Sequence, residues 1–439
     1  MIDDAREALV EIHRAALAAV DPVRAVDAVL CRDAAGISIA GRAVPAGQPI
    51  FVLAVGKAAA AMASAAEATL GESWADGFVL VPDGGERALA RGTLRVARHP
   101  LPDARGAIAS REILDWLARL PADATLLALL SGGGSSLLCA PAEGLSLPDV
   151  AATVDGLLRG GASIDELNTV RKHLSAATGG RLAVAAAAQR IEVLVISDVT
   201  SNRCDVIASG PFAPDPTSFA DARAVLDLRD PERAAPAAVR DHLAAGARGE
   251  RAETPDASDA AFGRVRHTIV ARNEDAVRAA SAAADARGWR SVALPRELAG
   301  EAREAAVALV ARADAEAGAT PVCLVAGGET VVTVRGAGRG GRSQELALAA
   351  ALSIEGRRDV ALLAAGTDGA DGPTDAAGAY VDGGTVARGR AAGVSAAEAL
   401  ADNDSHGFFA QEGGVLRTGP TGTNVADLAF VFRDADRYN

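Results

Sequence analysis

Glycines and charged residues stand directly after two short apolar runs of this 439-residue chain. Gly56 and Lys57 follow Ile50–Val55, and Asp198 follows the run Glu192–Ser197. A lysine at the start of a helix opposes the helix dipole unless an anion also lies there, so Lys57 is typical of a phosphate contact. A carboxylate at the end of a strand can accept a proton from a hydroxyl or hold magnesium. A solvated lysine and a helix-capping aspartate are the ordinary alternatives.

A glycine-rich segment follows a third apolar run, Thr125–Leu130. Consecutive glycines are unfavourable in regular elements, but they let backbone N–H groups approach an anion closely. The segment therefore predicts a phosphate-binding loop, although it lacks the Gly-Lys-Ser/Thr ending of a Walker A loop and a tight turn stays an alternative. Together with Gly56, its members Ser131, Gly132, Gly133, Gly134, Ser135 and Ser136 are the candidate phosphate ligands.

The C-terminal half offers a second glycine-rich loop and a cluster of acids. Gly328, Glu329 and Thr330 follow one apolar run and are further candidates for nucleotide binding. Residues 336–341 match Gly-x-Gly-x-x-Gly formally, but the next acid precedes the following strand instead of ending it, which weakens a dinucleotide interpretation. Arg339 and Arg342 in that loop favour contact with an anion, with a plain exposed loop as the alternative.

Three aspartates lie within residues 368–375, directly after another apolar run. Hard cations prefer oxygen ligands, so Asp371 there and Asp205 in the first half are candidate magnesium ligands, and Asp368 is a candidate for a substrate hydroxyl. The cluster does not fit the twelve-residue calcium loop, because no Glu stands at its closing position.

The sequence predicts alternating strands and helices as the elements that position these residues. Short apolar runs separated by Ala-rich helical stretches are typical of parallel, doubly wound α/β sheets. A polar, Pro- and Arg-rich stretch at residues 215–261 is the best linker candidate and predicts two domains, 1–250 and 251–439. In such sheets ligands bind beyond the carboxyl ends of the strands, where the candidates stand.

Bulk properties exclude several functions. The formal net charge of -13 opposes extended contact with nucleic acid. No stretch approaches about 18 uninterrupted apolar residues, and acids interrupt the apolar residues of the N-terminus, so neither a membrane span nor a secretory signal is expected. Four scattered cysteines give no zinc-site spacing. We expect a cytoplasmic protein that acts on small molecules.

Several segments, in order along nearly the whole chain, resemble the class II glycerate 2-kinase family, whose members join a glycerate-kinase N-terminal domain to a C-terminal MOFRL domain. The segments that carry the resemblance are Ala54–Ala58, Ser131–Ser136, Leu167–Ser175, Ser197–Val199, Gly341–Glu345, Gly366–Asp375 and Thr418–Asn424. Only the stretch from Asp215 to Asp259 contributes nothing to it.

The resemblance implies transfer of the ATP γ-phosphoryl group to the 2-hydroxyl of D-glycerate, giving 2-phosphoglycerate. It implies a Rossmann-like parallel-sheet domain and a smaller α/β MOFRL domain, with the active site in the cleft between them and with ATP and Mg2+ as cofactors. On this analogy Lys57, Asp198 and Arg342 take the charged catalytic positions. The candidate substrate ligands are Arg171, Lys172, Glu345, Asp368 and Asn424. A homodimer is left open.

Two rivals remain at this point. Some relatives bear the name hydroxypyruvate reductase, an NAD(P)H-dependent activity that would need a convincing cofactor loop. The second rival is a non-catalytic nucleotide-binding protein, which would bind ATP without releasing ADP.

Overall fold

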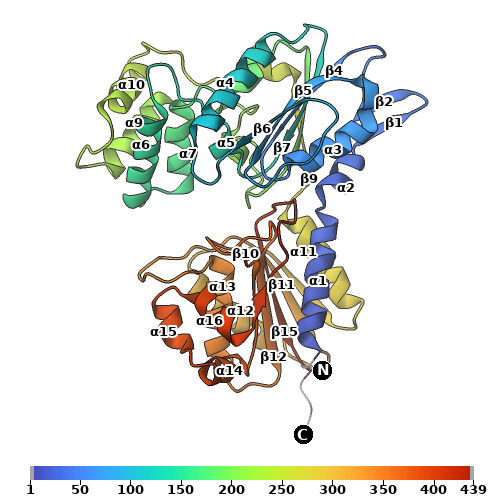
Figure 1. Cartoon of the computed structure of the whole chain (residues 1–439), viewed down its shortest axis with the longest axis vertical. Helices are drawn as coiled ribbons and strands as arrows, with labels where there is room; N and C mark the ends of the chain where they lie inside the picture. The colour runs from blue at the N-terminus through green and yellow to red at the C-terminus, as the bar shows by residue number, and fades with distance from the viewer. Residues whose placement is uncertain (1–3, 436–439) are drawn as a thin grey trace. The chain divides into compact units, whose positions relative to one another are not determined.

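The computed structural model describes residues 4–435 and divides into two compact units, each shown in Figure 1. The N-terminal unit is Pro22–Val270, and the C-terminal unit joins the residues before Pro22 to those from Ala271 onward. The sequence instead predicts the boundary at residue 250, with the N-terminal residues in the first domain. None of the helices within residues 4–435 combines the length and apolar character that a membrane crossing needs.

A six-stranded sheet forms the centre of the N-terminal unit, in the order β6-β5-β4-β7-β8-β9. The strands from β6 to β8 run parallel, and their interior members are buried because both faces are covered. Their bounds are β4 Ile50–Val55, β5 Trp74–Pro82, β6 Thr93–Ala97, β7 Thr125–Leu130, β8 Arg190–Ile196 and β9 Val265–Ala271. A small antiparallel sheet precedes them: β1 Leu30–Asp33, β2 Gly36–Ile39 and β3 Arg42–Ala43.

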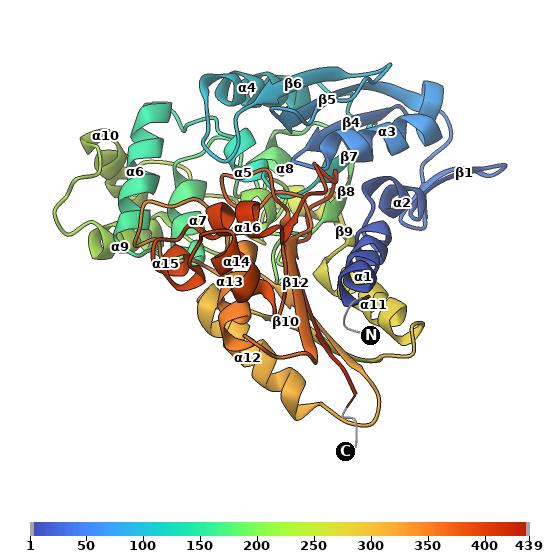
Figure 2. The ribbon, with the colours of Figure 1, turned by 60° about the horizontal axis from the view of Figure 1, so that its bottom comes forward.

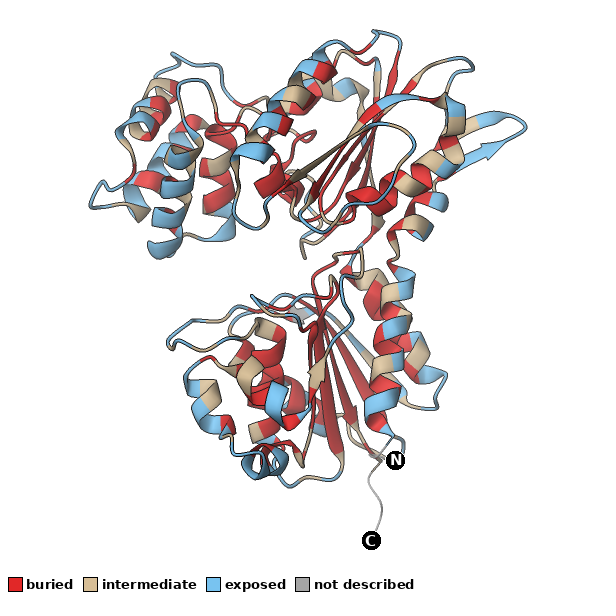
Figure 3. Cartoon of the chain, in the orientation of Figure 1, coloured by how far each residue is buried: buried red, intermediate tan, exposed pale blue. Residues whose placement is uncertain are grey.

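Helices cover this sheet because successive strand residues point to opposite faces. Leu53 and Val55 of β4 share one core with Ile113 of α4, whereas α3 packs on β4, β5 and β7. Figure 3 shows the buried strands between partly exposed helices. The helices are α2 Pro22–Asp27, α3 Ala59–Leu70, α4 Ala104–Ala118, α5 Gly134–Leu137 and α8 Arg181–Ala185, with short turns η1 Gly71–Ser73, η2 Ile207–Ser209 and η3 Ala260–Arg264.

Residues 215–261 are not a linker, which corrects the sequence-based expectation. Two helices of a helical lobe lie within this stretch, beside the sheet in Figure 1. Ser218 and Asp221 form a capping box that starts one of them, and Phe219, Ala222 and Leu226 bury its apolar face. The lobe consists of α6 Leu147–Arg159, α7 Ile164–His173, α9 Phe219–Arg229 and α10 Ala237–Ala247.

The C-terminal unit contains a mixed sheet, in the order β10-β11-β15-β12-β13-β14. Among the described strands of this sheet only β10 and β11 pair in parallel, so the sheet of this α/β unit is mixed. The central strand β15 runs antiparallel to both β11 and β12. The bounds are β10 Arg290–Leu298, β11 Val322–Gly328, β12 Val360–Gly366, β13 Gly378–Asp382, β14 Val415–Leu416 and β15 Asp427–Arg433.

Helices lie on both faces of this sheet as well. Figures 1 and 2 show α1 and α11 side by side on one face, where His13 of α1 packs edge-on to Phe430. On the other face α12 and α13 share the core with alternate residues of β11, β12 and β15. The helices are α1 Ala5–Ala19, α11 Asn273–Asp285, α12 Ala302–Ala315, α13 Arg342–Ser353, α14 Thr385–Ala391, α15 Ala396–Ala401 and α16 Ser405–Glu412.

Candidate functional site

Three candidate segments meet at one edge of the N-terminal sheet. Strands β4, β7 and β8 are neighbours, run parallel and end in register, with Val55 opposite Leu130 and Leu130 opposite Val195. Lys57, the glycine loop and Asp198 follow these three strands in turn. Both Lys57 and Asp198 are half-buried. These three candidates therefore share the carboxyl edge of a parallel sheet, where ligands bind in open α/β folds.

The first two loops are bonded directly to each other. The Lys57 amide donates to the Gly132 carbonyl oxygen at 2.9 Å, and the Ala58 amide donates to Ser131 Oγ at 3.0 Å. Gly56 has φ +124°, and a Cβ there would lie 2.5 Å from the Ser131 carbonyl oxygen. Only glycine therefore permits this close approach of the two loops.

Backbone N–H groups in these loops are available to an anion. The amides of Gly132, Gly133, Gly134 and Ser135 donate to none of the residues that the structure describes. Helix α3 begins at Ala59, so Lys57 precedes the helix and does not lie within its first turn. The N-cap residue, Ala58, has no side chain that could cap this helix. Adjacent unpaired amides beside a lysine form the kind of concave donor surface that binds phosphate.

Side chains that the sequence did not single out support the glycine loop. His99 Nδ1 lies 2.7 Å from Ser136 Oγ, and Ser135 Oγ lies 2.7 Å from Ser209 Oγ. The Ser209 hydroxyl also donates to Asn168 Oδ1 of helix α7 at 3.4 Å. Ser209 has φ +58°, an unusual value for a residue with a side chain. The loop is thus tied to helix α7.

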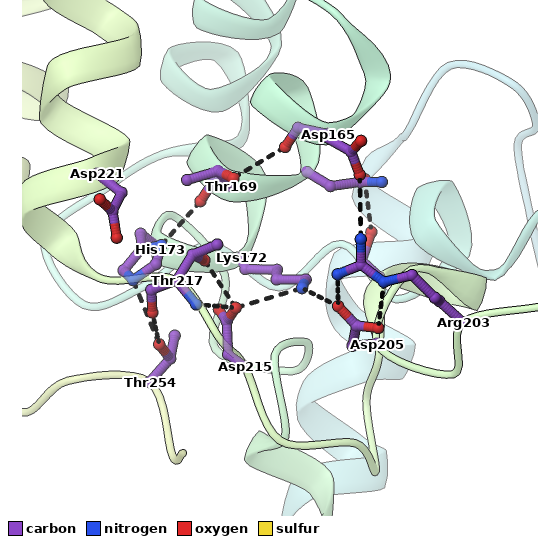
Figure 4. Close-up of polar contacts among 12 residues, drawn as sticks. Asp165, Thr169, Lys172, His173, Arg203, Asp205, Asp215, Thr217, Asp221 and Thr254 are labelled. Atoms are coloured by element: carbon purple, nitrogen blue, oxygen red, sulfur yellow. Dashed lines mark hydrogen bonds and ion pairs between the residues drawn. The ribbon is translucent and has the colours of Figure 1, made fainter. Parts of the chain in front are cut away.

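Lys172, a predicted substrate ligand on α7, is buried among carboxylates (Figure 4). Its Nζ lies 3.3 Å from Asp215 Oδ1 and 3.7 Å from Asp205 Oδ2. Asp205 in turn accepts two hydrogen bonds from the Arg203 guanidinium. Lys172 and Asp205 therefore each have a counter-ion within the protein. These contacts do not favour direct binding of substrate or metal by either side chain.

Arg342 lies at the first position of α13 in the C-terminal unit and is held by two carboxylates. Its Nε and Nη2 both donate to Asp427, the latter at 3.0 Å, and its Nη1 donates to Glu329. Burial alone would lower the pKa of the Arg342 guanidinium, but Asp427 and Glu329 raise it above its usual value. Register explains the cluster, because Gly328 of β11, Asp427 of β15 and Gly366 of β12 lie side by side.

Asp371 caps the same helix. Its carboxylate accepts from the Ser343 amide at 3.0 Å, from the Gln344 amide at 2.8 Å and from Gln344 Nε2 at 2.9 Å. Burial raises the pKa of Asp371 to about 6, the bonds from Gln344 oppose the rise, and nearby Asp427 adds to it. The side chain fixes the first turn of α13, and Arg342 with it.

The second glycine-rich loop packs against its own unit. The amides of Ala337 and Arg339 donate to the side chains of Asp402 and Asp404. A Cβ on Gly338 would lie 2.6 Å from the Asp404 Cα. These amides are therefore already used, and the glycines make room for the chain itself.

The remaining candidates are scattered in the C-terminal unit. Glu345 is buried and bonded to Arg303 and Asn403, so these contacts give no support to its assignment as a substrate ligand. Half-buried Asp368 follows β12, and its carbonyl accepts from Thr421 in the loop that carries Asn424. Thr330 is buried beside exposed Glu329.

Within residues 4–435 no group of three or more His, Cys, Asp or Glu side chains is arranged to hold a metal ion. The two predicted ligands, Asp205 and Asp371, belong to different compact units, and both are already hydrogen-bonded. Their assignment to magnesium stays a prediction that the observed contacts do not favour.

Asp427 is the residue that sequence reasoning missed. It stands before an apolar run, at the start of β15, and not after one. Because β15 is antiparallel to its neighbours, its first residue reaches the edge at which β11 and β12 end. The apolar run Leu428–Phe432 is the signal that could have revealed it.

Comparison with known proteins identifies the relatives of this arrangement. A family model described as a domain of unknown function (DUF4147) matches residues 8–244, and the MOFRL family model matches residues 322–427. The glycerate 2-kinase of Pyrococcus horikoshii is 38% identical over 99% of this chain and 98% of that protein. The chain belongs to the glycerate 2-kinase family. The resemblance noted in the sequence is thereby confirmed.

A solved structure of the glycerate 2-kinase family agrees with the fold. The crystal structure of glycerate kinase from Thermotoga maritima matches with a TM-score of 0.83 and 37% identity, covering 98% of this chain and 100% of that one. A protein of Agrobacterium vitis named putative hydroxypyruvate reductase is 38% identical over 97% of this chain and 93% of that protein. Relatives of similar identity thus carry two different activity names, glycerate 2-kinase and putative hydroxypyruvate reductase. The arrangement of the site residues is the evidence that distinguishes the two activities.

Proposed function

We propose that this chain transfers the γ-phosphoryl group of ATP to the 2-hydroxyl of D-glycerate, giving 2-phosphoglycerate and ADP. The observation that carries the proposal is the set of unpaired amides from Gly132 to Ser135. They lie in a loop that is hydrogen-bonded to the Lys57 backbone at the carboxyl edge of a parallel sheet. Phosphoryl transfer needs little covalent work from a protein, but it needs donors and positive charge around the phosphate oxygens. These loops supply both.

Asp198 is our candidate for orienting the substrate. It follows β8, the strand beside β7, so it stands at the same edge as the amides of the glycine loop. A carboxylate there can accept the hydrogen bond of the attacking hydroxyl and direct its lone pair at the phosphorus. We assign this role to Asp198 and not to Asp205, because Asp198 stands just beyond the carboxyl end of β8.

Arg342 is our candidate for stabilising the charge that develops on the transferred group. Asp427 holds two of its nitrogens, which fixes the plane of the guanidinium before any ligand arrives. Such pre-orientation lowers the cost of stabilising charge in the transition state. Since Lys57 and Arg342 belong to different units, the proposal requires both units to act on the same nucleotide.

Magnesium enters the proposal as the usual partner of ATP phosphates. The carboxylates of Asp205 and Asp371 fit it poorly, because each is already engaged by donors from the chain. We therefore assign no residue of this chain as its ligand.

A coupled assay of ADP release tests the function. We expect ADP release with D-glycerate and ATP, and little with L-glycerate, tartrate or hydroxypyruvate, and NMR of the product should place the phosphate on the 2-oxygen. Phosphorylation at the 3-oxygen, or ATP binding without ADP release, would contradict the proposal.

The same protein mixed with hydroxypyruvate and NADH tests the reductase. We expect no oxidation of NADH, because the amides of Ala337, Gly338 and Arg339, in the middle of the Gly336–Gly341 loop, donate to Asp402 and Asp404 and so are not available to a pyrophosphate. Rapid NADH oxidation in the absence of ATP would overturn the kinase assignment.

A further inference from the structure

Two neighbouring cations of helix α7 have different surroundings. Lys172 is buried and has Asp205 and Asp215 as counter-ions (Figure 4). Arg171 is half-buried, yet its guanidinium makes no hydrogen bond or ion pair with any residue that the structure describes. Burial lowers the pKa of Arg171, and no carboxylate offsets this effect. Arg171 is therefore a desolvated cation without a counter-ion among residues 4–435.

The acids nearest to Arg171 along the helix are committed elsewhere. Asp165 pairs with Arg203, and Glu166 caps the helix start and binds Arg229. The helix dipole favours a basic residue in the last turn, by about 0.3–1 kcal/mol, and this explains the residue type. It does not explain the partial burial, since an exposed lysine would serve equally well. Leaving a charge partly desolvated and unpaired is costly, which is typical of a position that awaits an anion.

The position of Arg171 on the helix indicates where that anion would lie. Asn168 precedes it by three residues, so the two side chains share one face of α7. Asn168 accepts a hydrogen bond from Ser209, whose hydroxyl lies 2.7 Å from Ser135 Oγ in the glycine loop. The face of α7 that carries Arg171 is thus turned toward the predicted phosphate-binding loop.

The geometry points to Arg171 as the residue that binds the carboxylate of the hydroxy acid and so selects 2-hydroxy acids over neutral polyols. This inference rests on the proposed kinase function. A planar guanidinium with a fork of donors matches a carboxylate in two parallel hydrogen bonds. Lys172, whose charge is neutralised internally, instead holds α7 to the segments that carry Asp205 and Asp215.

Replacement of Arg171 by methionine tests this role. We expect Arg171→Met to raise the KM for D-glycerate by roughly 100-fold, since truncating one partner of a charge pair has effects of that order. The KM for ATP should stay within about twofold of the wild-type value, and any slow turnover of glycerol should be unchanged. Arg171→Lys keeps the charge but loses the fork, so its KM for D-glycerate should lie between the two. Arg223→Met, at an exposed arginine of α9, is the matched control and should change none of these values.

Chemical rescue separates recognition from folding. Guanidinium chloride at non-denaturing concentration should restore part of the D-glycerate activity of Arg171→Ala, and far-UV circular dichroism should match the wild type. Unchanged KM for D-glycerate in Arg171→Met would overturn the inference, and so would an equal rise in the KM for ATP, which would mean a phosphate contact. If the wild-type protein released no ADP with D-glycerate, the proposed function would fail instead, and calorimetric binding of D-glycerate to both proteins would then test Arg171 by itself.

Discussion

The starts of helices α3 and α13 carry the two cations that we assign to catalysis, and they differ in how their N–H groups are used. Lys57 precedes α3, whose start has no side-chain cap. Arg342 begins α13, where Asp371 accepts from the first-turn amides. An uncapped start leaves donors for a phosphate, whereas a capped start holds its own geometry.

The two glycine-rich loops repeat this contrast. The loop after β7 leaves the amides of Gly132–Ser135 without a partner among residues 4–435. In the Gly336–Gly341 loop the amides of Ala337, Gly338 and Arg339 donate to Asp402 and Asp404. In the proposed function the N-terminal unit therefore supplies the donors for the nucleotide phosphates, and the C-terminal unit supplies one cation that its own carboxylates hold in place.

Among the substitutions that test this contrast, Lys57→Met should have the largest effect on activity. Loss of a cation aimed at the transferred group should lower kcat by roughly 10³-fold. Arg339→Met is the control, because Arg339 lies in the C-terminal glycine loop and donates to the Pro373 carbonyl. Steady-state kinetics of both variants with D-glycerate and ATP check the prediction. A Lys57→Met enzyme within tenfold of the wild-type kcat would remove Lys57 from the mechanism.

Asp371 gives a test through pH, because burial raises its pKa from 3.8 to about 6. An acid with a raised folded-state pKa binds more protons in the folded state than in the unfolded state between these values. Its contribution to stability is therefore largest below pH 3.8 and is lost as pH rises through about 6. The gap corresponds to about 3 kcal/mol.

Urea unfolding in EDTA from pH 4 to pH 7.5 measures this effect. The wild-type protein should show the loss of stability, and Asp371→Asn, although less stable overall because it loses an acceptor, should lack that component of the pH dependence. Repetition with Mg2+ distinguishes a helix cap from a metal ligand. If Mg2+ at pH 7.5 stabilised the wild type but not Asp371→Asn, Asp371 would be a metal ligand after all.

Asp427→Asn tests whether Arg342 must be held in place. We expect kcat to fall by roughly 10- to 100-fold with little change in the KM for ATP, because small misplacements of a catalytic group have effects of that size. Glu329→Gln is the comparison, since Glu329 is exposed and accepts a hydrogen bond from Nη1 of the guanidinium. It should change kcat by less than about threefold. Equal effects of the two substitutions would mean that Asp427 has no special positioning role.

Much of the candidate site in the N-terminal unit was predictable because it obeys one rule. Every residue that follows a buried parallel strand reaches the same edge, so apolar runs located Lys57, the glycine loop and Asp198 together. The same rule could not find Asp427, which precedes an antiparallel strand. It also gave no partners for Lys172, because Asp205 and Asp215 reach that side chain only through the packing of the helical lobe.

Composition is misleading at residues 215–261. Charged residues and prolines are frequent in this stretch and obscure the apolar positions Phe219, Ala222 and Leu226. Their three- and four-residue spacing, after the capping pair Ser218 and Asp221, is a helix signal that outweighs overall polarity. Glycine-rich segments are ambiguous in a further way. They indicate that another group approaches the backbone closely, but not whether that group belongs to a ligand or to the chain itself.

That ambiguity leads to a pair of alanine substitutions with the smallest expected effects. At Gly133, which has φ +85°, a new Cβ would lie 3.2 Å from His99 Cε1 and 3.3 Å from Lys57 Cγ, both on side chains that can move. Gly133→Ala should therefore cost about 1–2 kcal/mol of backbone strain, and its methyl group beside the open amides should raise the KM for ATP several-fold. At Gly338 the new Cβ would meet the Asp404 backbone, so Gly338→Ala should lower stability by about 1–3 kcal/mol and leave the KM for ATP unchanged.

Urea unfolding and ATP titrations of both variants check the pair. The contrast between the two loops fails if Gly338→Ala weakens ATP binding as much as Gly133→Ala does, because the C-terminal loop would then also contact the nucleotide.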